Sequence, residues 1–274
     1  MPLDPRVERA VRWAREHVPG SELALDALER ETTAGGTLIA GGLAYRLFLW
    51  LLPFGLVVSV VASFFQGDVE GSAGDLGLSA DSAHTMSEVV EESSHGRWYF
   101  LALGLFFLLW FAIGVARALR VAHTVAWGVR RERFRRPIYG AIVFTLFGTA
   151  LFATPVFSQW AREAWGVGGL IATILLVAIY AAGALLMMLL LPHPREARWT
   201  VLLPGAVLVG LGIECLHLVT ALYLAPRLGR SSELYGSLGA ATVILLWLYI
   251  IARLITLSAF LNAALWERHQ EQPG

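Results

Sequence analysis

The sequence contains no lysine, little charge of either sign and a single cysteine. All 21 basic residues are arginines, a bias typical of GC-rich codons that indicates a high-GC bacterium. Only 15% of the 274 residues are charged, whereas ordinary soluble domains carry about a quarter. Because Cys215 stands alone within an apolar run, no disulfide framework can form within one chain. These deficits exclude a disulfide-built domain and argue against a soluble globular protein.

Apolar residues are abundant and gathered into long runs. They make up 57% of the chain, and the mean hydropathy is +0.62. Six runs are long enough to cross about 30 Å of hydrocarbon at about 1.5 Å per residue. We therefore predict an all-α polytopic membrane protein whose residues 35–266 form a bundle of six transmembrane helices. The predicted spans lie near 37–65, 98–116, 138–159, 168–191, 200–224 and 235–265.

Residues 1–34 are predicted to form a cytoplasmic amphipathic segment that precedes the spans. Val7, Val11, Ala14 and Val18 recur at helical spacing, and arginines fill the opposite side. This pattern is typical of an interfacial helix that lies against anionic lipid head groups. No short apolar region followed by small residues is present at the start, so a removable signal peptide is not expected.

Arginine is distributed unequally between the two sides of the predicted bundle. Fifteen arginines fall in the N-terminal segment, the second loop (117–137), the fourth loop and the C-terminal tail (267–274), against four in the opposite loops. Short cytoplasmic segments accumulate arginine, so both termini are expected in the cytoplasm. The expected location is the bacterial inner membrane. The acidic loop 66–97 is then external, and loop 117–137 faces anionic head groups.

Three ionisable residues, Arg46, Glu214 and Arg253, lie well inside predicted spans. A charge at membrane depth costs several kcal/mol, so these side chains should face the bundle interior or a wet cavity. Our hypothesis is a polar cavity for transport, in which Glu214 pairs with Arg46 or Arg253. A purely structural Glu–Arg pair between helices is the alternative. The candidate cavity residues are Tyr45, Arg46, Glu214, His217, Tyr249 and Arg253.

Pro53 interrupts the first predicted span. Proline has no N–H, so the carbonyl of Leu49 loses its helical partner and a kink is expected. We predict that the kinked span forms one wall of the cavity, with Arg46 facing the fifth or sixth span. A kink that packing simply accommodates is the alternative.

Small residues predict close approach between helices. Gly41 and Gly42 occur in the first predicted span, and Gly205, Gly210 and Gly212 occur in the fifth. Glycine lets two helix backbones approach closely inside a membrane. Packing is therefore the role expected for each.

Recognisable catalytic patterns are missing from the sequence. His84, His95 and the loop acids have spacings that fit neither a zinc site nor a two-metal site. No phosphate-cradling glycine loop or nucleophile elbow occurs. The arginine cluster at 130–136 has one interleaved aromatic residue, Phe134, and lies where the positive-inside rule requires arginine. We expect no enzymatic activity, cofactor, metal or nucleic-acid partner.

Three motifs together resemble one protein family. They are Leu43-Ala44-Tyr45 with Pro53, then Leu191-Pro192, Arg195, Trp199 and Leu203-Pro204-Gly205-Ala206, and finally Tyr235–Ala240, Leu246–Tyr249 and Asn262. Over about residues 30–266 the chain resembles the YihY/virulence factor BrkB family of inner-membrane proteins, formerly labelled ribonuclease BN. It departs from the family pattern at Phe260, His123 and Trp127. The resemblance implies a six-span bundle, and the ribonuclease label does not fit these residues.

Three functions follow from these features. The leading one is transport of a lipid-linked or amphipathic envelope component, or of a solute, through the polar cavity. The second is a non-transporting scaffold for envelope assembly, with the acidic loop and basic interfacial helix as docking surfaces. The third is a membrane-embedded enzyme, for which the sequence offers no metal or nucleophile site.

The predicted topology can be tested by cysteine labelling. Asp75→Cys, introduced into a Cys215→Ser background, should react with a membrane-impermeant maleimide added from outside, because the acidic loop is expected there. Labelling of residue 75 only from the cytoplasmic face would reverse the assignment.

Overall fold

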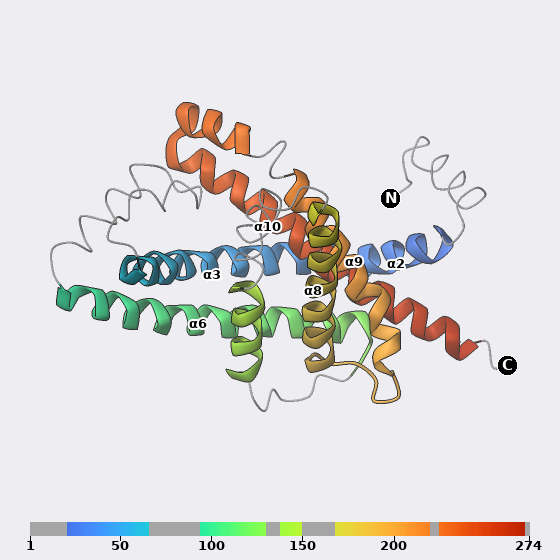
Figure 1. Cartoon of the computed structure of the whole chain (residues 1–274). Helices are drawn as coiled ribbons and strands as arrows, with labels where there is room; N and C mark the ends of the chain where they lie inside the picture. The colour runs from blue at the N-terminus through green and yellow to red at the C-terminus, as the bar shows by residue number, and fades with distance from the viewer. Residues whose placement is uncertain (1–20, 66–93, 130–137, 150–167, 220–224, 272–274) are drawn as a thin grey trace.

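The computed structural model describes residues 21–65, 94–129, 138–149, 168–219 and 225–271 (Figure 1). All regular secondary structure in these ranges is helical, which confirms the all-α class for the described part of the chain. The helices are α2 (Ser21–Thr33), α3 (Gly36–Phe65), α6 (Ser94–Ala126), Ile138–Thr149, α8 (Gly168–Leu190), α9 (Trp199–Val219) and α10 (Ala225–Glu271).

Five of these helices are long and apolar enough to cross a membrane, so the chain is a multi-pass membrane protein. Their apolar segments are Gly36–Val61, Trp98–Ala126, Thr173–Leu190, Trp199–His217 and Ala241–Gln270. The third predicted span, 138–159, is described only as the shorter helix Ile138–Thr149, because residues 150–167 lie outside the described ranges. The described residues thus support five spans. The third predicted span, and with it the total of six, stays an expectation.

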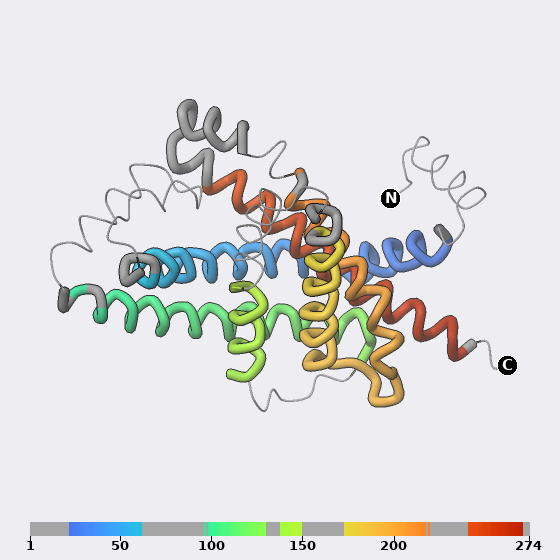
Figure 2. The backbone as a smooth tube through the Cα atoms, in the orientation of Figure 1, coloured from blue at the N-terminus to red at the C-terminus, as the bar shows by residue number. Residues whose placement is uncertain are grey.

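Helix α10 is the element around which the others are arranged. It packs against α2, α3, α6 and α9, while α3 pairs with α6 and α8 pairs with α9. Figure 1 shows α3 and α6 side by side, with α8 running across their common direction, and the tube in Figure 2 follows the same paths. The pairs α3–α6 and α8–α9 are therefore joined through α10.

Two apolar clusters each include residues of α10. In the first, the Trp50 ring stacks on Phe54 at 4.8 Å between centroids and meets Phe144 edge-on at 5.1 Å. In the second, Tyr180 of α8 and Leu202 of α9 are almost completely buried. Aromatic pairs in these arrangements add to the stabilisation that comes from burial alone.

The ends of two helices differ from the predicted bounds. Helix α6 continues to Ala126, so the loop predicted from residue 117 begins as helix and carries Arg117 on its surface. Helix α10 continues to Glu271, so the predicted tail at 267–274 also begins as helix. The predicted spans stop just before charged residues, but a helix can continue past the hydrocarbon because its charged side chains reach water there.

Glycines of α9 confirm the predicted close approach of helices. A Cβ at Gly205 would lie 2.6 Å from the Ser258 carbonyl oxygen of α10, and one at Gly210 would lie 2.8 Å from a carbonyl oxygen of α8. In α3, a Cβ at Gly41 or Gly42 would meet no atom of the described residues within 4 Å, so the close approach predicted there is not found in this part of the chain.

Asn262 of α10 joins the two backbones at this contact. Its Oδ1 accepts a hydrogen bond from the Gly205 N–H at 2.7 Å, and its Nδ2 donates to the Leu202 carbonyl at 3.1 Å. The side chain is fully buried. Pro204, which lies inside α9, disturbs the helical hydrogen bonds here. The amide therefore supplies an interhelical polar tie at a place where water cannot.

This contact predicts a position-dependent effect of adding one methyl group. Gly205→Ala should destabilise the protein by about 1–3 kcal/mol, because the new Cβ overlaps Asn262 and Ser258. Gly55→Ala is the matched control in α3, where a Cβ meets open space and should be neutral or slightly stabilising. Thermal unfolding in detergent measures both, and equal midpoints would contradict the close approach.

Candidate functional site

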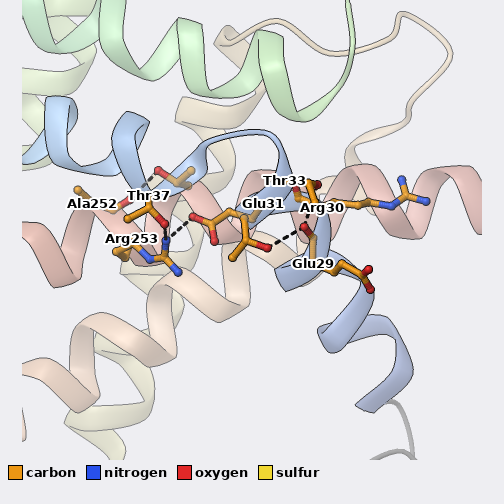
Figure 3. A network of polar contacts seen from close by, with 9 residues as sticks. Glu29, Arg30, Glu31, Thr33, Thr37, Ala252 and Arg253 are labelled. Carbon is orange, nitrogen blue, oxygen red and sulfur yellow. Dashed lines mark hydrogen bonds and ion pairs between the residues drawn. The ribbon is translucent and has the colours of Figure 1, made fainter. Parts of the chain in front are cut away.

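The most strongly paired charge in the described spans is Arg253 of α10. Its Nη1 donates to Glu31 Oε1 at 2.7 Å and to Thr37 Oγ1 at 2.7 Å. Figure 3 shows the three side chains pointing toward one another from α10, the end of α2 and the start of α3. The network therefore fastens three helices at one point.

The turn between α2 and α3 is shaped to admit Glu31. Gly35 has a φ of 74°, a conformation that glycine adopts at little cost. A Cβ at Gly36 would lie 2.4 Å from Cγ of Glu31, so only glycine leaves room for this carboxylate. Glu31 has 0% of its side chain exposed, whereas Arg253 keeps 26%.

Burial raises the pKa of Glu31 above its ordinary value, and the Arg253 guanidinium partly opposes that rise. The direction means that desolvation outweighs the attraction between the two groups. A buried ion pair of this kind contributes little net stability. Removing one partner, however, leaves the other as a buried charge whose desolvation is no longer compensated. The charge of Arg253 accordingly offsets part of the desolvation cost of burying the Glu31 carboxylate.

Two further ion pairs hold α2 along the C-terminal half of α10. They join Arg30 to Glu267 and Asp26 to Arg268, and all four side chains are at least one-third exposed. Exposed pairs contribute about 0–1 kcal/mol each, so they set the register of α2 more than its stability. The predicted interfacial segment is thus a helix docked on α10 from Ser21 onward, while residues 1–20 lie outside the described ranges.

The predicted partners of Glu214 are wrong. Arg253 pairs with Glu31, and Arg46 donates from Nη1 to the Gly114 carbonyl of α6 at 3.2 Å. The expectation that Arg46 faces the fifth or sixth span is also wrong, since Arg46 is exposed beside the second. Helix α6 admits the guanidinium because a Cβ at Gly114 would lie only 3.0 Å from it.

Glu214 instead belongs to a polar cluster between α8 and α9. Its Oε2 lies 3.6 Å from Nδ1 of His217, one turn along the same face, as the sequence spacing predicted. Tyr180 of α8 approaches His217 with 3.4 Å between its hydroxyl and Nδ1, and the two rings meet edge-on. Tyr180 is almost completely buried and Glu214 is 14% exposed. We call Tyr180, Glu214 and His217 the α8–α9 polar cluster.

The remaining candidates take separate positions. Tyr45 is 57% exposed, and Tyr249 is partly buried against the first apolar cluster. Helix α3 runs through Pro53 as one continuous helix, and Pro53 itself is buried. A kink at Pro53 and a cavity shared by all six candidate residues stay predictions.

Sequence reasoning missed Glu31, Tyr180 and Gly114. Glu31 was assigned to the surface segment, although an acid four residues before two adjacent glycines, where a span begins, indicated that it could be buried. Tyr180 could have been found as the one tyrosine within an otherwise apolar span. Gly114 gave no signal, because a glycine in an apolar run does not show which distant side chain will reach its carbonyl.

Comparison with known proteins supports one family. The model of the family described as virulence factor BrkB matches residues 27–274. A ribonuclease-like protein of Bacillus subtilis (strain 168), YfkH, is 28% identical over 133 residues. That match covers 48% of this chain and 45% of YfkH, so the aligned part is about half the length of each protein. No solved structure matches the chain.

The asymmetry between Glu31 and Arg253 can be tested with three variants. Arg253→Gln should cost about 3 kcal/mol because it leaves a buried carboxylate without its counter-charge. Glu31→Gln and the double variant should cost less, since neither retains a buried anion. Arg268→Gln, in an exposed pair of the same interface, is the control and should cost at most about 1 kcal/mol.

The Arg253→Gln deficit should also depend on pH. A carboxyl whose folded pKa is raised stabilises fully below its ordinary pKa and loses that contribution as pH rises through the raised value. Lowering the pH from about 8 to about 5 should therefore recover part of the stability of Arg253→Gln, but not of the double variant. Unfolding midpoints in detergent at both pH values measure this. A difference between Arg253→Gln and the double variant that does not change with pH would refute the buried, ionisable Glu31.

Proposed function

The chain belongs to the virulence factor BrkB family of membrane proteins, and we propose that it moves an amphipathic or lipid-linked envelope component, or a solute, across the bacterial inner membrane. Both termini lie in the cytoplasm in this proposal, as the arginine distribution indicates. No enzymatic role is included, because the sequence offers no catalytic constellation. The name of the Bacillus relative describes that protein and adds no nuclease activity here.

The observation that carries the proposal is the α8–α9 polar cluster. Glu214 and His217 lie within the apolar segment Trp199–His217, where an ionisable pair is costly and is therefore a functional site by default. A structural tie between helices needs no ionisable group, as the neutral amide of Asn262 shows at the Gly205 contact.

The chemistry of the cluster suits transient binding of a polar group. A carboxylate offers acceptors only, a tyrosine hydroxyl donates and accepts, and an imidazole does either according to its tautomer. Glu214 follows Trp199 by fifteen residues, or about 22 Å along α9, which places the cluster in the external half of the membrane in this orientation. A head group passing between α8 and α9 would find partners there.

A scaffold role is the second candidate, and the docked position of α2 favours it. Three ion pairs fix α2 against α10, while Leu28 and Glu29 remain exposed on its other side. A rigid helix with one free face is suited to holding a partner protein at the membrane surface.

Reconstitution distinguishes these roles. Proteoliposomes that contain fluorescent phosphatidylglycerol are treated with dithionite to measure movement of the lipid between leaflets. Glu214→Gln should slow this movement about tenfold, the scale of a lost hydrogen bond to a charged group. Cys215→Ser, a change at the adjacent exposed residue, is the matched control and should leave the rate unchanged. A wild-type rate no faster than in empty liposomes would favour the scaffold.

A further inference from the structure

Arg46 is an exposed cation in a membrane-spanning helix, and among the described residues it contacts a carbonyl oxygen rather than an acid. That contact uses one donor of Nη1. A guanidinium has five N–H donors in a planar fork, so most of its capacity remains for another group. In a lipid environment such a cation needs an anion or access to the head groups.

A second arginine lies close to Arg46 on the neighbouring helix. Arg117 is exposed and follows Gly114, the residue that Arg46 contacts, by three positions on α6. Residues three apart share one face of a helix. The seam between α3 and α6, which run side by side in Figure 1, therefore carries two cations about one turn apart.

The level of these arginines fits a head-group boundary. Trp98 and Tyr99 at the other end of α6 are each 65% exposed, as expected of aromatic side chains at one membrane interface. Along α6, Gly114 lies about 24 Å and Arg117 about 28 Å from Trp98. The hydrocarbon is about 30 Å thick, so the Gly114 level lies about 6 Å and Arg117 about 2 Å inside its far boundary, from where long arginine side chains reach the phosphates of the other leaflet.

Two glycines precede Arg46 on α3. Gly42 is four residues before Arg46 on the same face, and no atom of the described residues lies within 4 Å of a Cβ built at Gly42 or Gly41. A mid-span glycine costs about 1 kcal/mol relative to alanine, and no packing within the described residues accounts for either of these two. The absence of side chains leaves open space that a ligand from outside the chain can enter.

An apolar track runs from this point toward the membrane centre. Trp110 and Phe106 precede Gly114 by one and two turns on the same face of α6, are 65% and 57% exposed, and have ring centroids 6.2 Å apart. Acyl chains that continue from a phosphate at the arginines would lie along these rings. From the side of the chain termini toward the membrane centre, the order is open surface, cation and exposed rings, which matches the order of head group, phosphate and acyl chains in a phospholipid.

We propose that the seam between α3 and α6 is a binding site for an anionic phospholipid of the leaflet on the side of the chain termini. Arg46 binds the phosphate with its free donors, Arg117 adds a second cation, and the open surface at Gly42 admits the head group. Arginine is suited to this role, because its planar fork matches phosphate geometry. The site is separate from the α8–α9 polar cluster, and lipid bound here need not be transported.

Native mass spectrometry of the purified protein tests the site. The protein is titrated in detergent with dioleoyl-phosphatidylglycerol, dioleoyl-phosphatidylcholine and glycerol phosphate. Wild-type protein should retain phosphatidylglycerol, and Arg46→Gln should bind it about tenfold more weakly or worse. Gly42→Leu should give a similar loss by filling the surface, and it enters open space, so it tests the site even if Arg46→Gln fails to fold.

Two variants serve as matched controls. Gly55→Leu places the same side chain in open space elsewhere on α3, and Arg198→Gln removes an exposed arginine from the loop before α9. Both should bind phosphatidylglycerol as wild type does. Wild-type affinity in Arg46→Gln and Gly42→Leu, or equal binding of phosphatidylcholine, would overturn the proposal. Equal binding of glycerol phosphate would assign the site to free phosphate esters, and a change of oligomeric state with unchanged lipid affinity would assign it to a second copy of this chain.

Discussion

The structure depends on one constraint: a polar group within apolar helices must find its partner inside the chain. Arg253 meets this constraint through Glu31 and Thr37, and in doing so it determines where α2 ends, how the chain turns into α3 and which face α10 presents. The two glycines of the turn exist for the same reason, since one adopts a positive φ and the other leaves room for the carboxylate. The apolar clusters supply most of the packing between helices, but they do not specify how α2, α3 and α10 are positioned relative to one another.

The same constraint explains why polar side chains repeatedly sit opposite glycine. Asn262 reaches the backbone of α9 at Gly205, and Arg46 reaches a carbonyl of α6 at Gly114. In both places the missing side chain allows a polar group to approach the partner helix closely. Glycine therefore has two roles in this protein: it brings backbones together, and it exposes a backbone atom to a polar side chain.

Length and hydropathy predicted much of the fold. The bounds of α3 and α8 lie within one residue of the predicted spans, because an apolar run against lipid leaves little freedom. The ends of α6 and α10 were missed, since their charged extensions leave the hydrocarbon and α10 continues along α2. At the site, the proximity of Glu214 and His217 follows from helical spacing and was predicted. The pairing of Glu31 with Arg253 could not be predicted. Hydropathy places an acid in a segment but does not show which distant helix its side chain will face.

The separation between those two partners has a consequence for biosynthesis. Glu31 and Arg253 are 222 positions apart, and α3, α6, α8 and α9 lie between them in the chain. During translation Glu31 is made first and stays without this partner while the intervening helices are inserted. Closure of the ion pair thus waits until α10 has been made. A product truncated before α10 keeps an unneutralised carboxylate at the base of its first span, a chemical feature that distinguishes it from a product that contains α10.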